Sequence, residues 1–550
     1  MKKHSIQLFS LVIFFFLTVS AQKNDQNSIK LQNLFKEWRS FEIPPIVNGA
    51  PDYKKITFDK RFSEFLKLKS MLCDIDKSSL STEEKVDWTL IWAEMNGYLF
   101  NYKVLKPWER DPAFYKTIWT SRSDVPAHEG PSHHNLVELW KYKFPLNSVD
   151  KLKLISDLKV IPNLNKQAKQ NLIGNARDLW ITGIRTIKRQ SSDLKSLLKR
   201  IDPLDKVISK VIIDAISSTN EFVGWLEKEA INKNGPSGIG KENYTWYQKN
   251  VHLVPLTWEQ EVILLKNELA RAWTSLKYEE KNNSKLPYLS AVNNSKEYDE
   301  LAKKSAEELL SFLDDQKIIT VKPYYKDALQ PHLGKFIPKY KRNFFWITAH
   351  YDPKPLYSHF FHWFELAQMD IDPHKNEIRR KPLLYNIFDS RSEGVATAVE
   401  ELFMQAGLYK NNPRAREIVY ILIAQRAARG LGSLYAHANI ISMEEAGKIH
   451  SEYTPRGWMK TEKDLLIFEQ HLYLRQPGYG TSYITGKYLL ESAIADYSKI
   501  NEEENSKEII KDFFDLLMSI GNIPMTLVHW QMTNSNAHIK DLINECELNL

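Results

Sequence analysis

The sequence predicts a mainly α-helical protein. Glycine is scarce, at 20 of 550 residues, against roughly 7% in an average protein. Long stretches carry apolar residues at helical rather than alternating spacing. No linker rich in proline, serine or glycine and no fixed-period repeat divides the chain. We therefore expect one large helical unit, with two lobes around a central cleft.

Residues 1–21 have the layout of a cleavable secretory signal. A lysine pair precedes an apolar run from Leu8 to Val19, and the segment ends in the small residues Ser20 and Ala21. The run is about a dozen residues long, which is shorter than the roughly eighteen to twenty that a membrane span needs. No cysteine follows it, so a lipid anchor is not expected. We expect an exported protein, periplasmic or extracellular, with no membrane span.

Residues 22–550 are expected to form a single helical domain, with an N-terminal lobe at 22–235 and a site-bearing C-terminal lobe at 236–550. The formal net charge is +7, and acids and bases alternate at short range. This pattern argues against a nucleic-acid partner. Cys73 and Cys546 are the two cysteines, so the chain is not a disulfide scaffold, and whether they pair stays open.

Two helix starts are explicit in the sequence. Thr257 is followed three residues later by Gln260, and Ser442 by Glu445, which is the spacing of a capping box. The amphipathic runs that they open are WEQEVILLKNELARAWTSLKYEE and MEEAGKIHSEY. Loops punctuated by glycine or proline lie at residues 122–135, 233–243 and 351–355.

The segment HFFHWFE places two histidines three residues apart. On a helix that begins near Leu356, His359 and His362 would be neighbours, and Glu393 could supply an oxygen from a second helix. The three side chains could then hold one metal ion. The competing interpretation is that both rings are hydrogen-bonded core histidines, because phenylalanine and tryptophan surround them.

A second histidine-rich segment, HEGPSHH at residues 128–134, superficially resembles the HExxH motif of metalloproteases. Its spacing is wrong by one residue, and its glycine and proline oppose the helix that would align the histidines. We favour a solvated turn, with a binding loop as the alternative. No GxSxG nucleophile elbow occurs, so serine hydrolysis has little support.

Four segments form an ordered set in the C-terminal half of the chain. They are SEGVATAVEELFMQAGLY (392–409), RAARGLGSLYAHANIISMEEA (426–446), QPGYGTSYITGKYLLESAIADYSK (476–499) and FFDLLMSIGNIPMTLV (513–528). In order and spacing they resemble the bacterial domain of unknown function 885 family, whose members look like helical zinc metallopeptidases. The resemblance implies a zincin-related architecture, a zinc ion and a peptide or small-molecule substrate.

The family's metal motif is only partly kept. Its HExxPGH sequence falls at residues 356–362, where His362 alone matches. Glu393 matches the expected third metal ligand. The further positions that match, two of them substrate-binding arginines, are Arg426, Arg429, His437, Tyr483 and Gly486. The chain departs from the family at Ser433, where an aspartate is usual, and at Leu472, where an arginine is usual.

The first hypothesis is a metal-dependent hydrolase with an altered site. His359 would take the place of the lost ligand beside His362 and Glu393. The missing general base would be a glutamate on one of the neighbouring helical runs, namely Glu365, Glu400 or Glu401.

In this first hypothesis, His437 and Tyr483 could stabilise the oxyanion or orient the substrate.

The second hypothesis is a catalytically inactive, metal-free protein that binds peptides or another ligand in the same cleft. Its motivation is the lost base, because removing a general base typically costs about two to four orders of magnitude in rate. Metal-free acid/base chemistry by the same histidines and Tyr483 ranks last, since no substrate suggests itself.

Overall fold

The computed structural model describes residues 27–460, 463–502, 508–542 and 546. Within these residues the regular structure is almost all helical, and each of the four strands is two residues long. The predicted fold class, mainly α-helical, is therefore confirmed. The predicted signal peptide lies outside the described residues.

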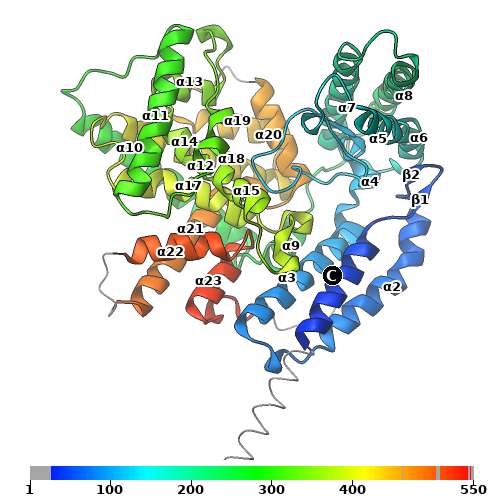
Figure 1. Cartoon of the computed structure of the whole chain (residues 1–550), viewed down its shortest axis with the longest axis horizontal. Helices are drawn as coiled ribbons and strands as arrows, with labels where there is room; N and C mark the ends of the chain where they lie inside the picture. The colour runs from blue at the N-terminus through cyan, green and yellow to red at the C-terminus, as the bar shows by residue number, and fades with distance from the viewer. Residues whose placement is uncertain (1–26, 461–462, 503–507, 543–545, 547–550) are drawn as a thin grey trace, which may run out of the picture.

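Helices follow one another along the whole described chain (Figure 1). Residues 27–42 form the first. Those of the N-terminal part are α2 (Lys55–Cys73), α3 (Thr82–Phe100), α4 (Pro107–Arg110), α5 (Ser148–Leu158), α6 (Val160–Asn171), α7 (Arg177–Leu198), α8 (Lys206–Ala230) and α9 (Lys241–Asn250). Those of the C-terminal part are α10 (Trp258–Asn282), α11 (Ser295–Asp315), α12 (Tyr325–Leu329), α13 (Phe344–Tyr351), α14 (Lys354–His359), α15 (Phe361–Ile371), α16 (Glu377–Arg380), α17 (Asp389–Gln405), α18 (Ala415–His437), α19 (Met443–Glu452), α20 (Lys463–Arg475), α21 (Tyr479–Ile500), α22 (Ile509–Ser519) and α23 (Met525–Thr533).

The strands form two small pairs. β1 (Ile46–Val47) and β2 (Ala50–Pro51) are antiparallel, whereas β3 (Ile118–Trp119) and β4 (Val137–Glu138) are parallel. Single helical turns of other types connect the larger helices, namely η1 (Lys77–Ser79), η2 (Asn101–Leu105), η3 (Pro112–Tyr115), η4 (Leu139–Lys141), η5 (Gln330–His332), η6 (Lys339–Lys341), η7 (Leu384–Asn386), η8 (Pro455–Gly457) and η9 (Ala537–Ile539).

Both predicted capping boxes are present. The Thr257 side chain accepts a hydrogen bond from the backbone amide of Gln260 at the start of α10, and the Gln260 side chain accepts one from the Thr257 backbone amide. Ser442 and Glu445 make the same reciprocal pair at the start of α19. Each box satisfies two amides that a helix start leaves without intrahelical partners.

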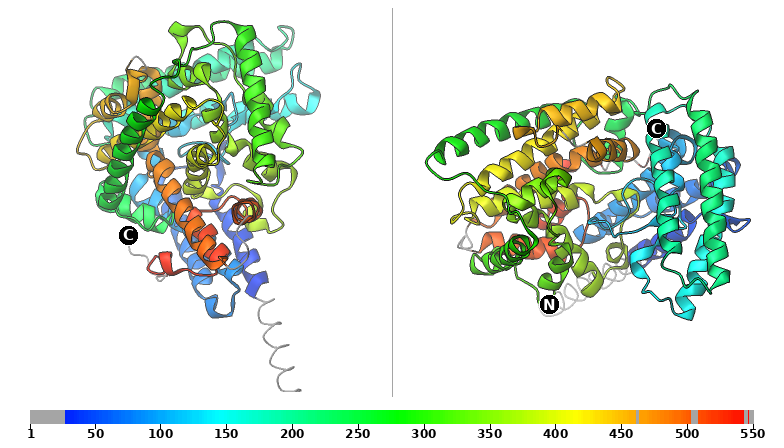
Figure 2. Two further views of the ribbon diagram at one scale, coloured as in Figure 1. Left: turned by 90° about the vertical axis from the view of Figure 1, so that its left-hand side faces the viewer. Right: turned by 90° about the horizontal axis from the view of Figure 1, so that it is seen from above.

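The largest cluster of buried apolar side chains extends along the chain from Leu31 to Ile539. A smaller cluster, from Ile118 to Ala215, lies among β3, β4 and the helices α5 to α8. Figure 1 shows α5 to α8 together at the upper right, beside the C-terminal helices, and the view from above keeps the two groups side by side (Figure 2). Residues of both predicted lobes thus contribute to the largest of these clusters.

The helices α17 and α21 cross at two glycines. A Cβ on Gly486 would lie 2.1 Å from the Ser390 carbonyl oxygen, and one on Gly394 would lie 2.4 Å from the Gly486 Cα. These are closer than real Cβ contacts, so the crossing has room only for glycine. The close approach brings Glu393, the neighbour of Gly394, next to the first turns of α21.

Cys73, the last residue of α2, forms a disulfide with Cys546, and their Cα atoms are 5.9 Å apart. The bond joins positions separated by 473 residues. Whether the two cysteines pair, which the sequence left open, is thereby answered. In the described part of the chain, every helix is too short or too polar to cross a membrane.

Candidate metal centre

The two histidines of HFFHWFE lie on two short helices. α14 ends at His359 and α15 begins at Phe361, and the residue between them, Phe360, has a ψ of 12°. The expected single helix from Leu356 is therefore wrong, because the backbone rotation at Phe360 interrupts the helical hydrogen-bond ladder. The rings of His359 and His362 still meet, with centroids 4.9 Å apart and planes inclined by 83°.

Glu393 approaches both rings from α17. Its Oε2 lies 3.2 Å from His362 Nε2 and 3.5 Å from His359 Nε2. One possible ligand atom of each residue lies within 4.8 Å of the other two. The exposed fractions are 9% for His359 and 1% for the other two residues. The structure thus brings together the three side chains that the sequence nominated as metal ligands.

The separations suit a small divalent ion. Ligand atoms at about 2.0–2.1 Å from a tetrahedral zinc lie about 3.3 Å from one another. Both histidine–carboxylate distances, 3.2 and 3.5 Å, are close to this value, and all three atoms lie within 4.8 Å of one another. Two imidazoles and one carboxylate also match the donor set of several catalytic zinc sites, which keep a fourth position for water or substrate.

A buried ion pair between Glu400 and Arg426 contacts Nδ1 of His359, the ring nitrogen other than the one near Glu393. The His359 Nδ1 lies 3.0 Å from Glu400 Oε1 and 3.1 Å from Arg426 Nη2. Arg426 also donates to both oxygens of Glu400 at 2.8 and 2.6 Å. Glu400 follows Glu393 by two helical turns on α17, so both carboxylates face the same way. A carboxylate on the far nitrogen is the usual support of a metal-bound histidine. Arg426, predicted to bind substrate, is 1% exposed and neutralised by Glu400.

A cavity of about 300 Å³ opens beside His359. The Tyr483 ring lies nearly parallel to the His359 ring at 6.2 Å. The Arg429 guanidinium carbon is 3.7 Å from the Tyr483 ring centre, and Arg429 Nη1 donates to Glu469 Oε1 at 3.0 Å. The structure therefore places both Tyr483 and Arg429 in the cavity wall.

The sequence interpretation missed two residues of this cavity, Tyr479 and Glu129. The Tyr479 hydroxyl lies 2.5 Å from Glu393 Oε1 and 3.0 Å from Glu129 Oε1. The Tyr483 hydroxyl donates to the Tyr479 oxygen at 3.2 Å. Tyr479 precedes Tyr483 by one helical turn, and this spacing is a signal that could have found it. The only signal for Glu129 was the acid within HEGPSHH.

The HEGPSHH segment is not a solvated turn. Gly130 and His133 are buried, and the Gly130 amide donates to Gln476 Oε1 at 2.6 Å. His133 Nε2 bonds to the Thr117 hydroxyl at 3.0 Å. The favoured interpretation fails because side chains remote in sequence give the loop hydrogen bonds that water would otherwise supply.

Two predicted catalytic residues lie elsewhere. Glu365 pairs with Arg391 at 2.8 Å and lines a different cavity. His437 is fully buried, and its Nε2 donates to a backbone carbonyl of α20 at 2.8 Å. The alternative base Glu401 is held in ion pairs with α10 and α21. These residues are committed to packing and charge balance around the site.

The charges of the cluster follow from its contacts. Burial opposes ionisation of Glu393, but His362 and His359 outweigh it and hold the pKa of Glu393 well below its ordinary value. Burial likewise opposes protonation of His362, yet Glu393 raises the pKa of His362 to about 9. Desolvation, with Asp124 and Glu393 nearby, raises the pKa of Glu129 to about 8.

Comparison with known proteins gives the fold. No family model and no curated protein matches the chain. A candidate lipoprotein of unknown function from Shewanella oneidensis superposes with a TM-score of 0.63 at 14% identity, over 93% of this chain and 99% of that one. A candidate lipoprotein from Colwellia psychrerythraea gives 0.65 at 14% identity, over 94% and 99%. The chain is thus similar over nearly its whole length to solved structures, and the likeness concerns the fold.

Proposed function

We propose that this chain is an exported, metal-dependent hydrolase that acts on peptides or related small substrates. The observation that carries the proposal is the convergence of His359, His362 and Glu393 beside a cavity, at separations suited to zinc. The carboxylate behind His359 and the resemblance to the domain of unknown function 885 family support the same conclusion.

The groups around the cavity would each have a different role in hydrolysis. The ion would supply Lewis acidity and lower the pKa of a water molecule. Glu400 and Arg426 both contact His359 Nδ1, and the opposite ring nitrogen, Nε2, lies 3.5 Å from Glu393. Tyr483 and Arg429 line the cavity on the side of α18 and α21, where they can orient a substrate carbonyl and donate to its developing negative charge.

Export is supported by two observations. Residues 1–21 have the layout of a secretory signal. The Cys73–Cys546 disulfide is a bond that persists in oxidising compartments and is rare in the cytosol. Together they favour a periplasmic or extracellular protein.

Metal analysis of the purified protein tests the proposal directly. We expect one zinc per chain in the wild type and almost none in His362→Ala or Glu393→Ala. His374→Asn is the matched control, because His374 lines a different cavity and should leave the metal content unchanged. Hydrolysis is measured on unblocked dipeptides and on p-nitrophenyl acetate, with and without chelator. Metal-free protein, or turnover indifferent to chelator, would contradict the proposal.

The second candidate function is ligand binding without metal or turnover. Its specific support is that His362, through its Nε2, and Glu393 form a buried pair of opposite charges without an ion. It predicts that dipeptides bind to chelator-treated protein with unchanged affinity and are not hydrolysed. A hydrolytic rate that disappears in Glu393→Ala would exclude it.

A further inference from the structure

The glutamates near the metal ligands on α15 and α17 are already engaged. Glu365 is paired with Arg391, Glu400 with Arg426, and Glu401 with Arg271. A carboxylate in a buried pair with arginine is not free to turn toward a water molecule, because leaving the pair would strand an uncompensated buried charge. None of the glutamates that the sequence suggests is therefore free to act as the general base.

Glu129 contacts the cluster from the loop at residues 122–135. It lines the same cavity as His359 and Tyr483. Among the described residues, the one side-chain hydrogen bond of Glu129 is to Tyr479, at 3.0 Å. The same Tyr479 hydroxyl is 2.5 Å from Glu393. The Tyr479 hydroxyl has one proton and donates to one carboxylate at a time. Its oxygen nevertheless lies within hydrogen-bond distance of both Glu129 and the candidate metal ligand Glu393.

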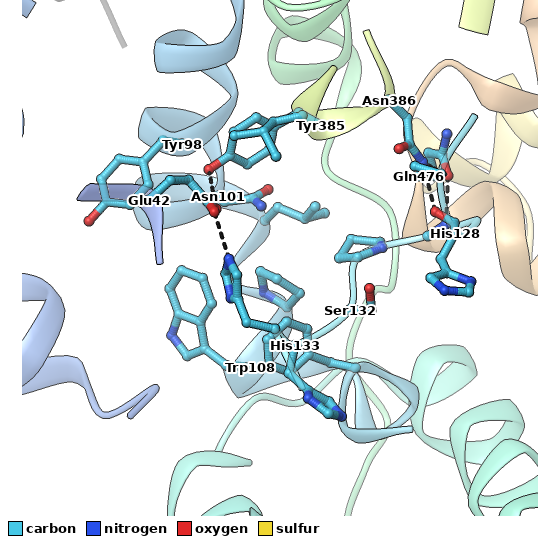
Figure 3. Close-up of a pocket in the computed structure, with 18 of the residues that line it drawn as sticks. Glu42, Tyr98, Asn101, Trp108, His128, Ser132, His133, Tyr385, Asn386 and Gln476 are labelled. Atoms are coloured by element: carbon cyan, nitrogen blue, oxygen red, sulfur yellow. Dashed lines mark hydrogen bonds and ion pairs between the residues drawn. The ribbon is translucent and has the colours of Figure 1, made fainter. Parts of the chain in front are cut away.

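The backbone on both sides of Glu129 is bonded to Asn386 and Gln476, which line a second cavity of about 360 Å³ (Figure 3). The Gln476 Oε1 accepts from the Gly130 amide at 2.6 Å and from Asn386 Nδ2 at 2.9 Å. Asn386 Nδ2 also donates to the His128 carbonyl at 3.2 Å. Both neighbours of Glu129 are therefore bonded to one amide pair, and Asn386 belongs to the turn that leads into α17. This anchoring gives the side chain a defined position relative to Glu393.

We propose that Glu129 is the general base of this site, an inference that rests on the proposed metal-dependent hydrolysis. Its carboxylate takes a proton from the attacking water as the water oxygen forms a bond to the substrate carbonyl carbon. The carbon–nitrogen bond then breaks, its electron pair passes to the nitrogen, and Glu129 returns the proton to that nitrogen. The products are a carboxylic acid and an amine, and no oxidant or reductant is needed.

The test substitution is Glu129→Gln, which keeps the side-chain shape and the contact with Tyr479 but cannot accept a proton. With the best dipeptide of the panel, kcat is expected to fall by about 10²- to 10⁴-fold, while KM and zinc content stay unchanged. Asp124→Asn is the matched control. It removes one negative charge from the same cavity and should change kcat by less than about tenfold.

Chemical rescue adds a readout that a structural role would not move. Added formate should restore part of the kcat of Glu129→Ala and should have no effect on Asp124→Asn or on Glu393→Ala. A Glu129→Gln variant with wild-type kcat, or one that loses its zinc, would overturn the base role. If the base role of Glu129 is overturned but Glu393→Ala still abolishes both zinc binding and turnover, the proposed metal-dependent hydrolysis stands without this base. A wild type without metal-dependent turnover overturns both.

Discussion

Replacing Gly486 by alanine tests the helix crossing that assembles the site. The new Cβ would lie 2.1 Å from the Ser390 carbonyl oxygen and 2.6 Å from the Gly394 Cα. Because ordinary contact begins near 3.4 Å, α17 and α21 would have to separate by about 1 Å. Overpacking of this kind typically costs about 1–3 kcal/mol, and the rigid backbone contacts favour the upper end of that range.

The gain in helix propensity offsets part of this cost. Alanine is about 1 kcal/mol better than glycine in a helix interior, so the net loss expected for Gly486→Ala is about 2 kcal/mol. Gly224→Ala in α8 is the matched control, since its Cβ would meet nothing within 4 Å. That variant should be as stable as the wild type or more stable by up to about 1 kcal/mol.

Thermal and denaturant unfolding of the three proteins, followed by circular dichroism, measures the two effects. Zinc titration of the folded Gly486→Ala variant should also show weaker binding, because Glu393 moves away from Tyr479 when the helices separate. Equal midpoints for the two alanine variants, or a Gly486→Ala variant within about 0.5 kcal/mol of the wild type, would refute the steric reasoning.

Three further predictions follow from single contacts. Denatured but unreduced protein should show no reactive thiol, and reduction should release two, from Cys73 and Cys546; free thiols before reduction would contradict the pairing. Glu400→Gln should weaken zinc binding about 10- to 100-fold in calorimetric titration, since His359 loses its supporting carboxylate, and unchanged affinity would argue against that support. Burial lowers the pKa of His437 to about 4, so the unfolded chain binds a proton that the folded chain excludes between about pH 6.5 and 4. The free energy of unfolding should therefore decrease as the pH is lowered from about 6.5 to 4, by up to about 3 kcal/mol from this group, and His437→Gln should flatten the slope of that free energy against pH.

The local features of the fold were predictable from the sequence. The capping boxes at Thr257 and Ser442 depend on a side chain and an amide three residues apart, so the sequence spacing contains the whole interaction. The helical class followed from apolar spacing for the same reason. The break between His359 and His362 escaped prediction, because phenylalanine at 360 carries no breaker signal and its backbone angle depends on tertiary packing.

The site was predictable only where its members lie on strongly patterned helices. His359, His362, Glu393 and Tyr483 were identified from spacing and family resemblance, and the structure brings them to one place. Glu365 was also chosen by spacing, yet it pairs with an arginine 26 positions along the chain and lines another cavity. Spacing shows which residues share a helix face, but not which neighbour that face will meet.

The sequence by itself determined the helical class, the starts of individual helices and the chemical types that gather at the site, because those properties depend on residues within a few positions of one another. The tertiary structure alone decided that Glu129 joins Glu393. Their carboxylates meet through Tyr479, and the loop that carries Glu129 is held by Gln476 and Asn386. These contacts join residues 86 to 350 positions apart and arise from the packing of whole helices, which no local pattern records.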